Sequence, residues 1–146
     1  MRIFPALLAG FFLFIGNGWQ TDFENAKKQA EKENKLILLN FSGSDWCIPC
    51  IRLTKEIFES TTFKEFADNK LVLMNADFPR LKKNKLSKDQ QKKNDKLADK
   101  YNSQGIFPLT LLLDAKGNVI KSWEGFPNLS AEQFTSLLNG FVNARK

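Results

Sequence analysis

The chain has 146 residues, 42% of them hydrophobic, and a formal net charge of +6. A chain of this length and apolar content is expected to fold as one domain around a real core and not to be disordered. Histidine is absent, which excludes a His general base, a Cys–His protease pair and zinc or copper sites that contain His. Two cysteines are too few for a scaffold built from disulfides.

The N-terminus has the layout of a secretory signal. Arg2 precedes an apolar run over residues 3–15, and Gly16 and Gly18 stand at positions −3 and −1 of a cleavage before Trp19. The run is shorter than the about 20 residues that span a bilayer. We therefore expect a signal peptide that ends at Gly18 and an exported, periplasmic mature domain that begins at Trp19. An uncleaved membrane anchor is the alternative.

A surface helix and a buried strand are predicted next. Residues 21–35 indicate a helix with an apolar stripe at Phe23, Ala26 and Ala30. Residues 36–41, "LILLNF", form a nearly unbroken apolar run of strand length. Such a run favours a strand that is covered on both faces, as in a central parallel sheet.

Both cysteines follow at once, in the stretch "SDWCIPC". A helix is predicted from about Cys47 to Glu59. Cys50, Leu53 and Ile57 recur in it at i, i+3 and i+7, which turns Cys50 inward. Cys47 then lies in the first turn or at its cap.

A short helix over residues 61–69 and a second buried strand over 71–77 complete a strand–helix–strand unit. Residues 82–100 then carry eight lysines and three aspartates, so this Lys-rich insertion holds most of the net charge. It is either a docking face for an acidic partner or a solvated, partly helical insertion, and the second interpretation is favoured. Aromatic residues do not interleave with the lysines, so the pattern does not favour nucleic-acid binding.

The last third of the chain predicts two more strands and a helix. Residues 109–114 form a third apolar run, and the turn signal "AKGN" separates it from a strand that begins at Val119, as in an antiparallel hairpin. Ser130 and Gln133 form a capping-box pattern at the start of a final amphipathic helix. The expected fold is a mixed sheet with helices on both faces.

The spacing of the cysteines favours redox chemistry. Cysteines at i and i+3 in the first turn of a helix lie on one face, so they can form a disulfide with little backbone movement. Unpaired N–H groups and the helix dipole favour a thiolate at Cys47, and such thiols have pKa values of about 3.5–7.5. Cys47 can then attack a substrate disulfide, and Cys50 can resolve the mixed disulfide. Pro49 is compatible because the first turn needs no intrahelical N–H bond.

Two other uses of the pair stay open. Zinc needs four ligands, and without His the remaining two could come only from carboxylates or a second chain. A purely structural disulfide is the stronger alternative. However, a bridge between residues three apart closes a very small loop and constrains the unfolded chain little.

The mature chain resembles the thioredoxin family over about residues 21–144. "LILLNF" leading into "WCIPC" is similar to the family's strand followed by W-C-G-P-C. "GIFPLTLLLD" is similar to its G-x-P-T before a strand, "KGNVIKSWEGF" to its G-x-V hairpin, and "NAD" to the end of its second strand. The resemblance implies a thioredoxin-like α/β fold, with a central mixed β-sheet flanked by helices on both faces. It also implies a thiol–disulfide oxidoreductase that needs no cofactor.

The resemblance places further residues around the dithiol. They are an aromatic ring beside it, a cis-proline that faces it, the residue whose backbone pairs with an extended substrate, and a glycine in a flanking loop: Trp46, Pro108, Phe107 and Gly125. Two positions depart from the family pattern. Asn40 stands where a buried acid is usual, so deprotonation of the resolving thiol would rely on water or an incoming thiolate. Ile48 replaces a Gly and makes the rim of the site more apolar.

The expected function is therefore the reduction or exchange of disulfides in exported proteins, by a monomer that is served by a soluble or membrane thiol electron donor. Ile48 and Pro49 offer the thiolate no charged or His partner, which favours a reductase or isomerase over a strong oxidant. The alternative is a binding or scaffold protein of the same fold that keeps its disulfide as structure.

Overall fold

The fold is built on a four-stranded mixed sheet. The computed structural model describes residues 18–145, so the predicted signal peptide, apart from Gly18, lies outside the described residues. The strand order is β2-β1-β3-β4. The strands are β1 (Leu36–Ser42), β2 (Leu71–Asp77), β3 (Leu109–Leu113) and β4 (Val119–Glu124). β1 and β2 are parallel and β3 is antiparallel to β1 and β4, so the predicted strand–helix–strand unit and the hairpin are confirmed.

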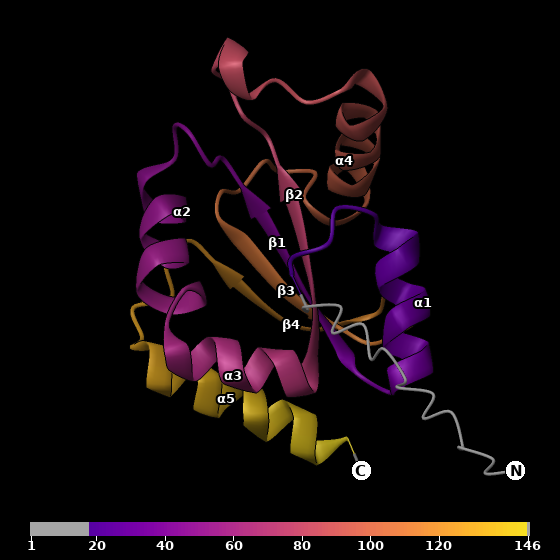
Figure 1. Cartoon of the computed structure of the whole chain (residues 1–146), viewed down its shortest axis with the longest axis vertical. Helices are drawn as coiled ribbons and strands as arrows, with labels where there is room; N and C mark the ends of the chain where they lie inside the picture. Colours follow the sequence, from indigo (N-terminus) through magenta and orange to yellow (C-terminus); the bar gives the residue numbers. More distant parts are fainter. Residues whose placement is uncertain (1–17, 146) are drawn as a thin grey trace, which may run out of the picture.

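Helices cover both faces of this sheet, as predicted (Figure 1). One face carries α1 (Phe23–Glu33) and α4 (Lys88–Tyr101). The other face carries α2 (Ile48–Leu53), α3 (Thr61–Lys70) and α5 (Ala131–Ala144). A π-helix, η1 (Thr54–Phe58), extends α2, and a short 3-10 helix, η2 (Lys82–Asn84), follows β2. Within residues 18–145, no helix has both the length and the apolar character needed to cross a membrane.

The strand β1 forms the centre of the core because all seven of its residues are buried. Successive side chains of a strand point to opposite faces of the sheet. Ile37, Leu39 and Phe41 accordingly pack toward α1 and α4, and Leu36 and Leu38 pack toward α2, α3 and α5. This two-sided burial explains why the strand reads as a continuous apolar run.

The helix that carries the cysteines differs from the prediction in one respect. One regular helix was predicted from Cys47 to Glu59, but the α-helical turns end at Leu53 and a π-helical turn follows. In this turn the N–H of Glu59 donates to the carbonyl of Thr54, five residues earlier. The wider turn places two consecutive side chains, Ile57 and Phe58, in the core together.

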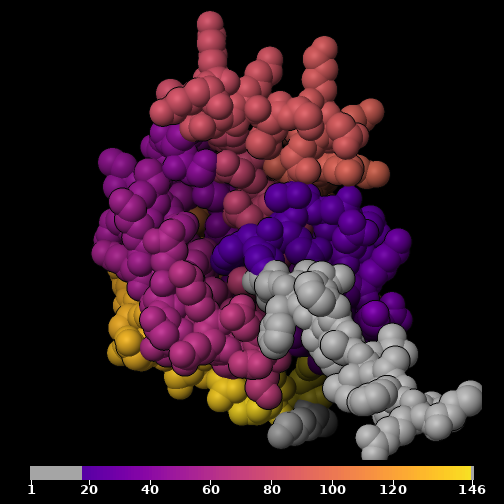
Figure 2. Space-filling view, viewed as in Figure 1, coloured from indigo at the N-terminus to yellow at the C-terminus, as the bar shows by residue number. Residues whose placement is uncertain are grey.

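Part of the Lys-rich insertion is a regular helix, as the favoured interpretation predicted. Ser87 caps the N-terminus of α4, and Asn94 and Leu97 are its buried residues. The insertion and the short segment that joins it to β2 form one end of the molecule (Figure 2). The buried side chains of Asn94 and Leu97 attach a helix whose other residues are mostly exposed to solvent.

The C-terminal helix α5 offers a matched test of core packing, because Leu138 is fully buried and Leu137 is 39% exposed. We expect Leu138→Ala to lower the free energy of unfolding by about 2–5 kcal/mol, since it removes methyl groups from a packed core and leaves a cavity. Leu137→Ala should cost about 1 kcal/mol or less. Urea unfolding of both variants measures the difference, and equal losses would contradict this packing.

Candidate active site

The two cysteines stand at the start of α2, immediately after the sheet. Cys47 is the N-cap residue, with extended backbone angles, and Cys50 lies in the first helical turn. Their Cα atoms are 5.3 Å apart and their sulfurs are joined in a disulfide. Pro49 occupies the first turn, where its missing N–H leaves no hydrogen bond unmade. The predicted placement of the pair is therefore confirmed, with Cys47 as the cap.

The sulfur of Cys47 takes the part that a serine or aspartate oxygen takes at other helices of this chain. It accepts a hydrogen bond from the backbone N–H of Cys50 at 3.3 Å. Ser60 and Ser130 cap α3 and α5 in the same way, through the N–H three residues later. An N–H donor and the positive end of a helix both stabilise a negatively charged sulfur relative to a neutral thiol.

The dithiol is recessed beside an exposed apolar rim. Cys47 is 4% exposed and Cys50 is 2% exposed, whereas the neighbouring Ile48 is 70% exposed. Pro49 is exposed as well. Ile48 and Pro49 therefore form an exposed apolar surface next to the buried disulfide.

An aromatic cluster forms one wall of the site. The ring of Trp46 packs edge-on against Phe107 at 5.5 Å between centroids, and Phe107 packs in the same way against Phe78 at 5.4 Å. The indole N–H of Trp46 donates to the carbonyl of Phe78 at 2.7 Å. Gly43 makes this packing possible, because a Cβ atom there would lie 2.3 Å from the Trp46 ring. The structure thus brings Trp46, which directly precedes Cys47, together with Phe107.

The peptide bond between Phe107 and Pro108 is cis, as the resemblance implied. Pro108 is buried, and its carbonyl accepts a hydrogen bond from the N–H of Gly125 at 2.8 Å. Gly125 has a φ of +73°, a conformation that side chains disfavour. The loop after β4 is therefore fixed directly to the segment that carries Pro108.

A row of polar side chains that are buried or partly buried crosses three strands on the face that α2 covers. Asn40 of β1 donates to Asn75 of β2 at 3.1 Å and accepts from the hydroxyl of Thr110 in β3 at 3.1 Å. Asn40 is 3% exposed, and it shares its face of the sheet with Leu36 and Leu38. An amide can satisfy both neighbours, but it does not accept a proton as a carboxylate does.

A second set of hydrogen bonds fixes the turn before Cys47 to the chain that follows β2. The carboxylate of Asp45 accepts from the backbone N–H groups of Arg80 and Leu81, at 2.9 and 3.0 Å, and from the side chain of Asn84 at 3.0 Å. The N–H of Arg80 and the other two donors hold the pKa of Asp45 below its ordinary value. The adjacent Ser44 donates its backbone N–H to Asp77 at 2.9 Å.

Sequence reasoning missed the residues that support this turn, namely Gly43, Asp45, Asp77 and Arg80. Their partners lie more than 30 residues away along the chain, except for Gly43. Only Gly43 carries a local signal, since a glycine three residues before a tryptophan leaves room for its ring. In the sequence Asp45 is indistinguishable from an ordinary turn residue, because its hydrogen-bond partners come close only when β2 lies beside β1.

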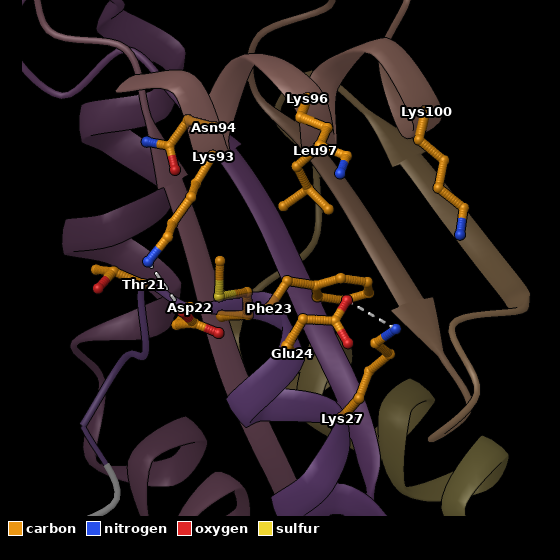
Figure 3. Close-up of a pocket in the computed structure, with 11 residues that line it drawn as sticks. Thr21, Asp22, Phe23, Glu24, Lys27, Lys93, Asn94, Lys96, Leu97 and Lys100 are labelled. Carbon is orange, nitrogen blue, oxygen red and sulfur yellow. Dashed lines mark hydrogen bonds and ion pairs between the residues drawn. The ribbon is translucent and has the colours of Figure 1, made fainter. Parts of the chain in front are cut away.

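A separate cavity of about 300 Å³ lies between α1 and α4 (Figure 3). Phe23, Met74 and Leu97 contribute apolar surface to it. Lys93 of α4 bonds across it to Asp22, which caps α1, at 3.2 Å. Neither cysteine lines this cavity. In the described part of the chain, no three His, Cys, Asp or Glu side chains gather as metal ligands would.

Known proteins share both the fold and parts of the sequence. A family profile described as a thioredoxin-like domain matches residues 23–141. Disulfide bond reductase DsbH of Chlamydia pneumoniae is 36% identical over 99 residues, which are 68% of this chain and 57% of that protein. A solved structure named DsbH Oxidoreductase is 30% identical with a TM-score of 0.77, over 86% of this chain and 84% of that chain. A thioredoxin from Thermus thermophilus has a TM-score of 0.60 at 14% identity, over 82% and 83% of the two chains, and shows the fold alone.

The chain therefore belongs to the family of thioredoxin-like domains. The predicted fold class is confirmed by the same matches. The matched region spans little more than half the length of the Chlamydia pneumoniae reductase. The resemblance noted in "WCIPC", "GIFPLTLLLD" and the C-terminal hairpin thus reflects membership of a family and not a coincidence of short motifs.

The lowered pKa of Asp45 makes a pH-dependent prediction. A carboxyl whose pKa is lower in the folded state than in the unfolded state stabilises the fold above its unfolded pKa, and this contribution is lost as the pH falls through its folded pKa. Asp45→Asn should therefore lower stability at pH 7 and have a smaller effect below about pH 4, near the ordinary Asp pKa. Urea unfolding midpoints at several pH values measure this.

The exposed Asp99 provides the control, because its side chain forms no ion pair or hydrogen bond within residues 18–145. Asp99→Asn should leave the unfolding midpoint nearly unchanged at every pH. If Asp45→Asn behaved like Asp99→Asn, the hydrogen bonds from Arg80, Leu81 and Asn84 would not hold the active-site turn in solution.

Proposed function

We propose that this protein is a thiol–disulfide oxidoreductase that reduces or exchanges disulfides in exported proteins. The observation that carries the proposal is the position of Cys47. Its sulfur caps the N-terminus of α2, and Cys50 lies in the first turn of the same helix. The 36% identity to a protein named a disulfide bond reductase supports the same activity. Two cysteines three residues apart at a helix N-terminus can gain two electrons as a disulfide and lose them again as a dithiol.

The reaction begins with the reduced dithiol. The Cys47 thiolate attacks one sulfur of a substrate disulfide, forms a mixed disulfide and releases the first substrate thiolate. The Cys50 thiolate then attacks the sulfur of Cys47, closes the Cys47–Cys50 disulfide and releases the second substrate thiolate. The substrate gains two electrons and the dithiol loses two. The disulfide seen in the structure corresponds to the oxidised product of this cycle.

The surroundings of the dithiol support particular roles in substrate binding. The backbone of Phe107, next to the cis peptide bond, would pair with an extended substrate segment, and Pro108 would face the disulfide. Gly125 would flank the bound segment, since its N–H is fixed to the carbonyl of Pro108. Trp46, Ile48 and Pro49 would contact the substrate through an apolar rim, for which the exposure of Ile48 is the main support.

The amide at Asn40 bears on the second step of the cycle. A buried carboxylate below α2 could take the proton of the resolving thiol, but the amide of Asn40 is committed to Asn75 and Thr110. The proton of Cys50 would therefore go to water or to the leaving substrate thiolate. This arrangement would make resolution slower than attack, which suits a protein that holds its substrates in mixed disulfides long enough to exchange them.

Export and partners complete the proposal. A signal at the N-terminus, or an uncleaved anchor, would place the domain in the periplasm, where disulfides are present in substrate proteins. The oxidised protein would be returned to the dithiol by a soluble or membrane thiol donor. The domain would act as a monomer. It would need no cofactor, because the two sulfurs themselves carry the electrons.

One observation favours the alternative of a scaffold protein with a structural disulfide. Both cysteines are almost fully buried in the disulfide form, and buried sulfur atoms react slowly. A redox titration separates the two functions. A catalytic couple has a potential in the range of about −120 to −270 mV, whereas a structural disulfide lies below about −300 mV.

Reduction of insulin by a thiol donor tests the enzymatic activity. The intact protein should accelerate it, and Cys47→Ser should abolish the acceleration because the attacking sulfur is lost. Cys50→Ser should retain the attack and accumulate a mixed disulfide with the substrate, visible on a non-reducing gel. Equal insulin reduction by the intact protein and by Cys47→Ser would rule out the proposed chemistry.

A further inference from the structure

A short cationic loop lies directly beside the active-site turn. It comprises residues 80–85, "RLKKNK", which carry four positive charges and no acidic residue. Resting on the function proposed above, we infer that this cationic loop is part of the substrate-binding surface and selects protein disulfides flanked by acidic residues. This assigns a substrate class to the site, and it distinguishes residues 80–85 from the helical part of the Lys-rich insertion.

The cationic loop is fixed to the turn that precedes Cys47 by two independent contacts. The carboxylate of Asp45 accepts hydrogen bonds from the N–H groups of Arg80 and Leu81 and from the side chain of Asn84. The guanidinium of Arg80 also stacks on the ring of Trp46, with 3.7 Å between its central carbon and the ring centroid. The residues in contact with the loop are therefore the two that immediately precede Cys47.

The lysines of the cationic loop are available to a partner. Lys82, Lys83 and Lys85 are exposed, and none of them forms an ion pair within the described residues. Leu81 is 47% exposed in the middle of the loop. An apolar residue among uncompensated charges can contact a partner that brings both carboxylates and apolar side chains.

The helical part of the insertion differs in both charge and contacts. α4 mixes five lysines with three aspartates. Lys93 pairs with Asp22 at 3.2 Å and with Asp89 at 3.3 Å, as Figure 3 shows for the contact with Asp22. The side chain of Asn94 donates to the carbonyl of Asp77 at 2.9 Å, which fixes α4 to the end of β2. α4 thus anchors the insertion and mixes both signs of charge, whereas all four charges of the cationic loop are positive.

Uncompensated charges near a reactive group act mainly on encounter with a charged substrate. A patch of one sign can raise association rates by about 10–1,000-fold, and salt screens this effect. An acidic segment on either side of a substrate cysteine would be drawn toward the cationic loop while its disulfide reaches the sulfur of Cys47. A substrate with neutral flanks would gain nothing from the loop.

Two model peptides test the inference. Each carries one cysteine in a disulfide with the same reporter thiol, and they differ only in glutamates or glutamines around that cysteine. At about 0.01 M salt, where the Debye length is about 30 Å, the full chain should reduce the glutamate peptide with a kcat/KM about tenfold above that for the glutamine peptide. At about 1 M salt, where the Debye length is about 3 Å, the ratio should fall to about one.

Two triple variants with the same change in charge locate the effect. Lys82→Gln/Lys83→Gln/Lys85→Gln should bring the low-salt ratio between the peptides close to one. The control Lys28→Gln/Lys64→Gln/Lys70→Gln alters exposed lysines of α1 and α3 and should keep the wild-type ratio. All six positions are on the surface, so both variants are expected to fold.

The outcomes separate this inference from the proposed function. If the protein reduced both peptides at equal rates in low salt, or if the control variant lost the preference as fully as the loop variant, the inference would be overturned while the activity stood. If neither peptide were reduced, the proposed function would fail and the inference would fail with it. A ratio that disappears only in the loop variant assigns the selection to Lys82, Lys83 and Lys85.

Discussion

The hydrogen bond from the N–H of Cys50 to the sulfur of Cys47 is the interaction on which the proposed chemistry of this domain depends. It makes Cys47 the cap of α2, and a cap must lie outside the helix while facing its first turn. The same geometry brings the second cysteine within disulfide distance and leaves Pro49 in a turn that tolerates it. Helix capping and redox pairing are thus one structural requirement, met by a sulfur where other helices of the chain use serine or aspartate.

The position of Cys47 depends on the turn that precedes it, and contacts with β2 and the loop after β2 fix this turn. Ser44 and Asp45 bond to the end of β2 and to the loop that follows it, and the ring of Trp46 fills the space that Gly43 leaves open. The position of the dithiol therefore depends on the parallel pairing of β1 and β2. An insertion after β2 that would otherwise be a solvent-exposed appendage becomes part of the surroundings of the candidate active site.

Local sequence patterns predicted the strands, the inward face of Cys50 and the capping of the last helix, because each of these depends on residues close together in the chain. The contacts of Asp45 with Arg80 and Asn84 join residues 35 and 39 positions apart. The spacing of apolar residues along the chain does not predict contacts over such separations. The π-helical turn at Thr54 was missed for a related reason, since the need to bury both Ile57 and Phe58 arises only from tertiary packing. Pro108 and Gly125 were predicted as site residues only from the family resemblance, because composition and spacing do not identify them.

The most direct test of the account is the rate at which iodoacetamide alkylates Cys47 in the reduced protein as a function of pH, followed by mass spectrometry in the Cys50→Ser variant. Stabilisation of the thiolate by the helix N-terminus predicts that this rate titrates with a pKa clearly below the about 8.5 of a free cysteine, within the range of about 3.5–7.5 known for such sites. Titration at or above the value for a free cysteine would contradict the account, because the sulfur at the start of α2 would then be an ordinary thiol.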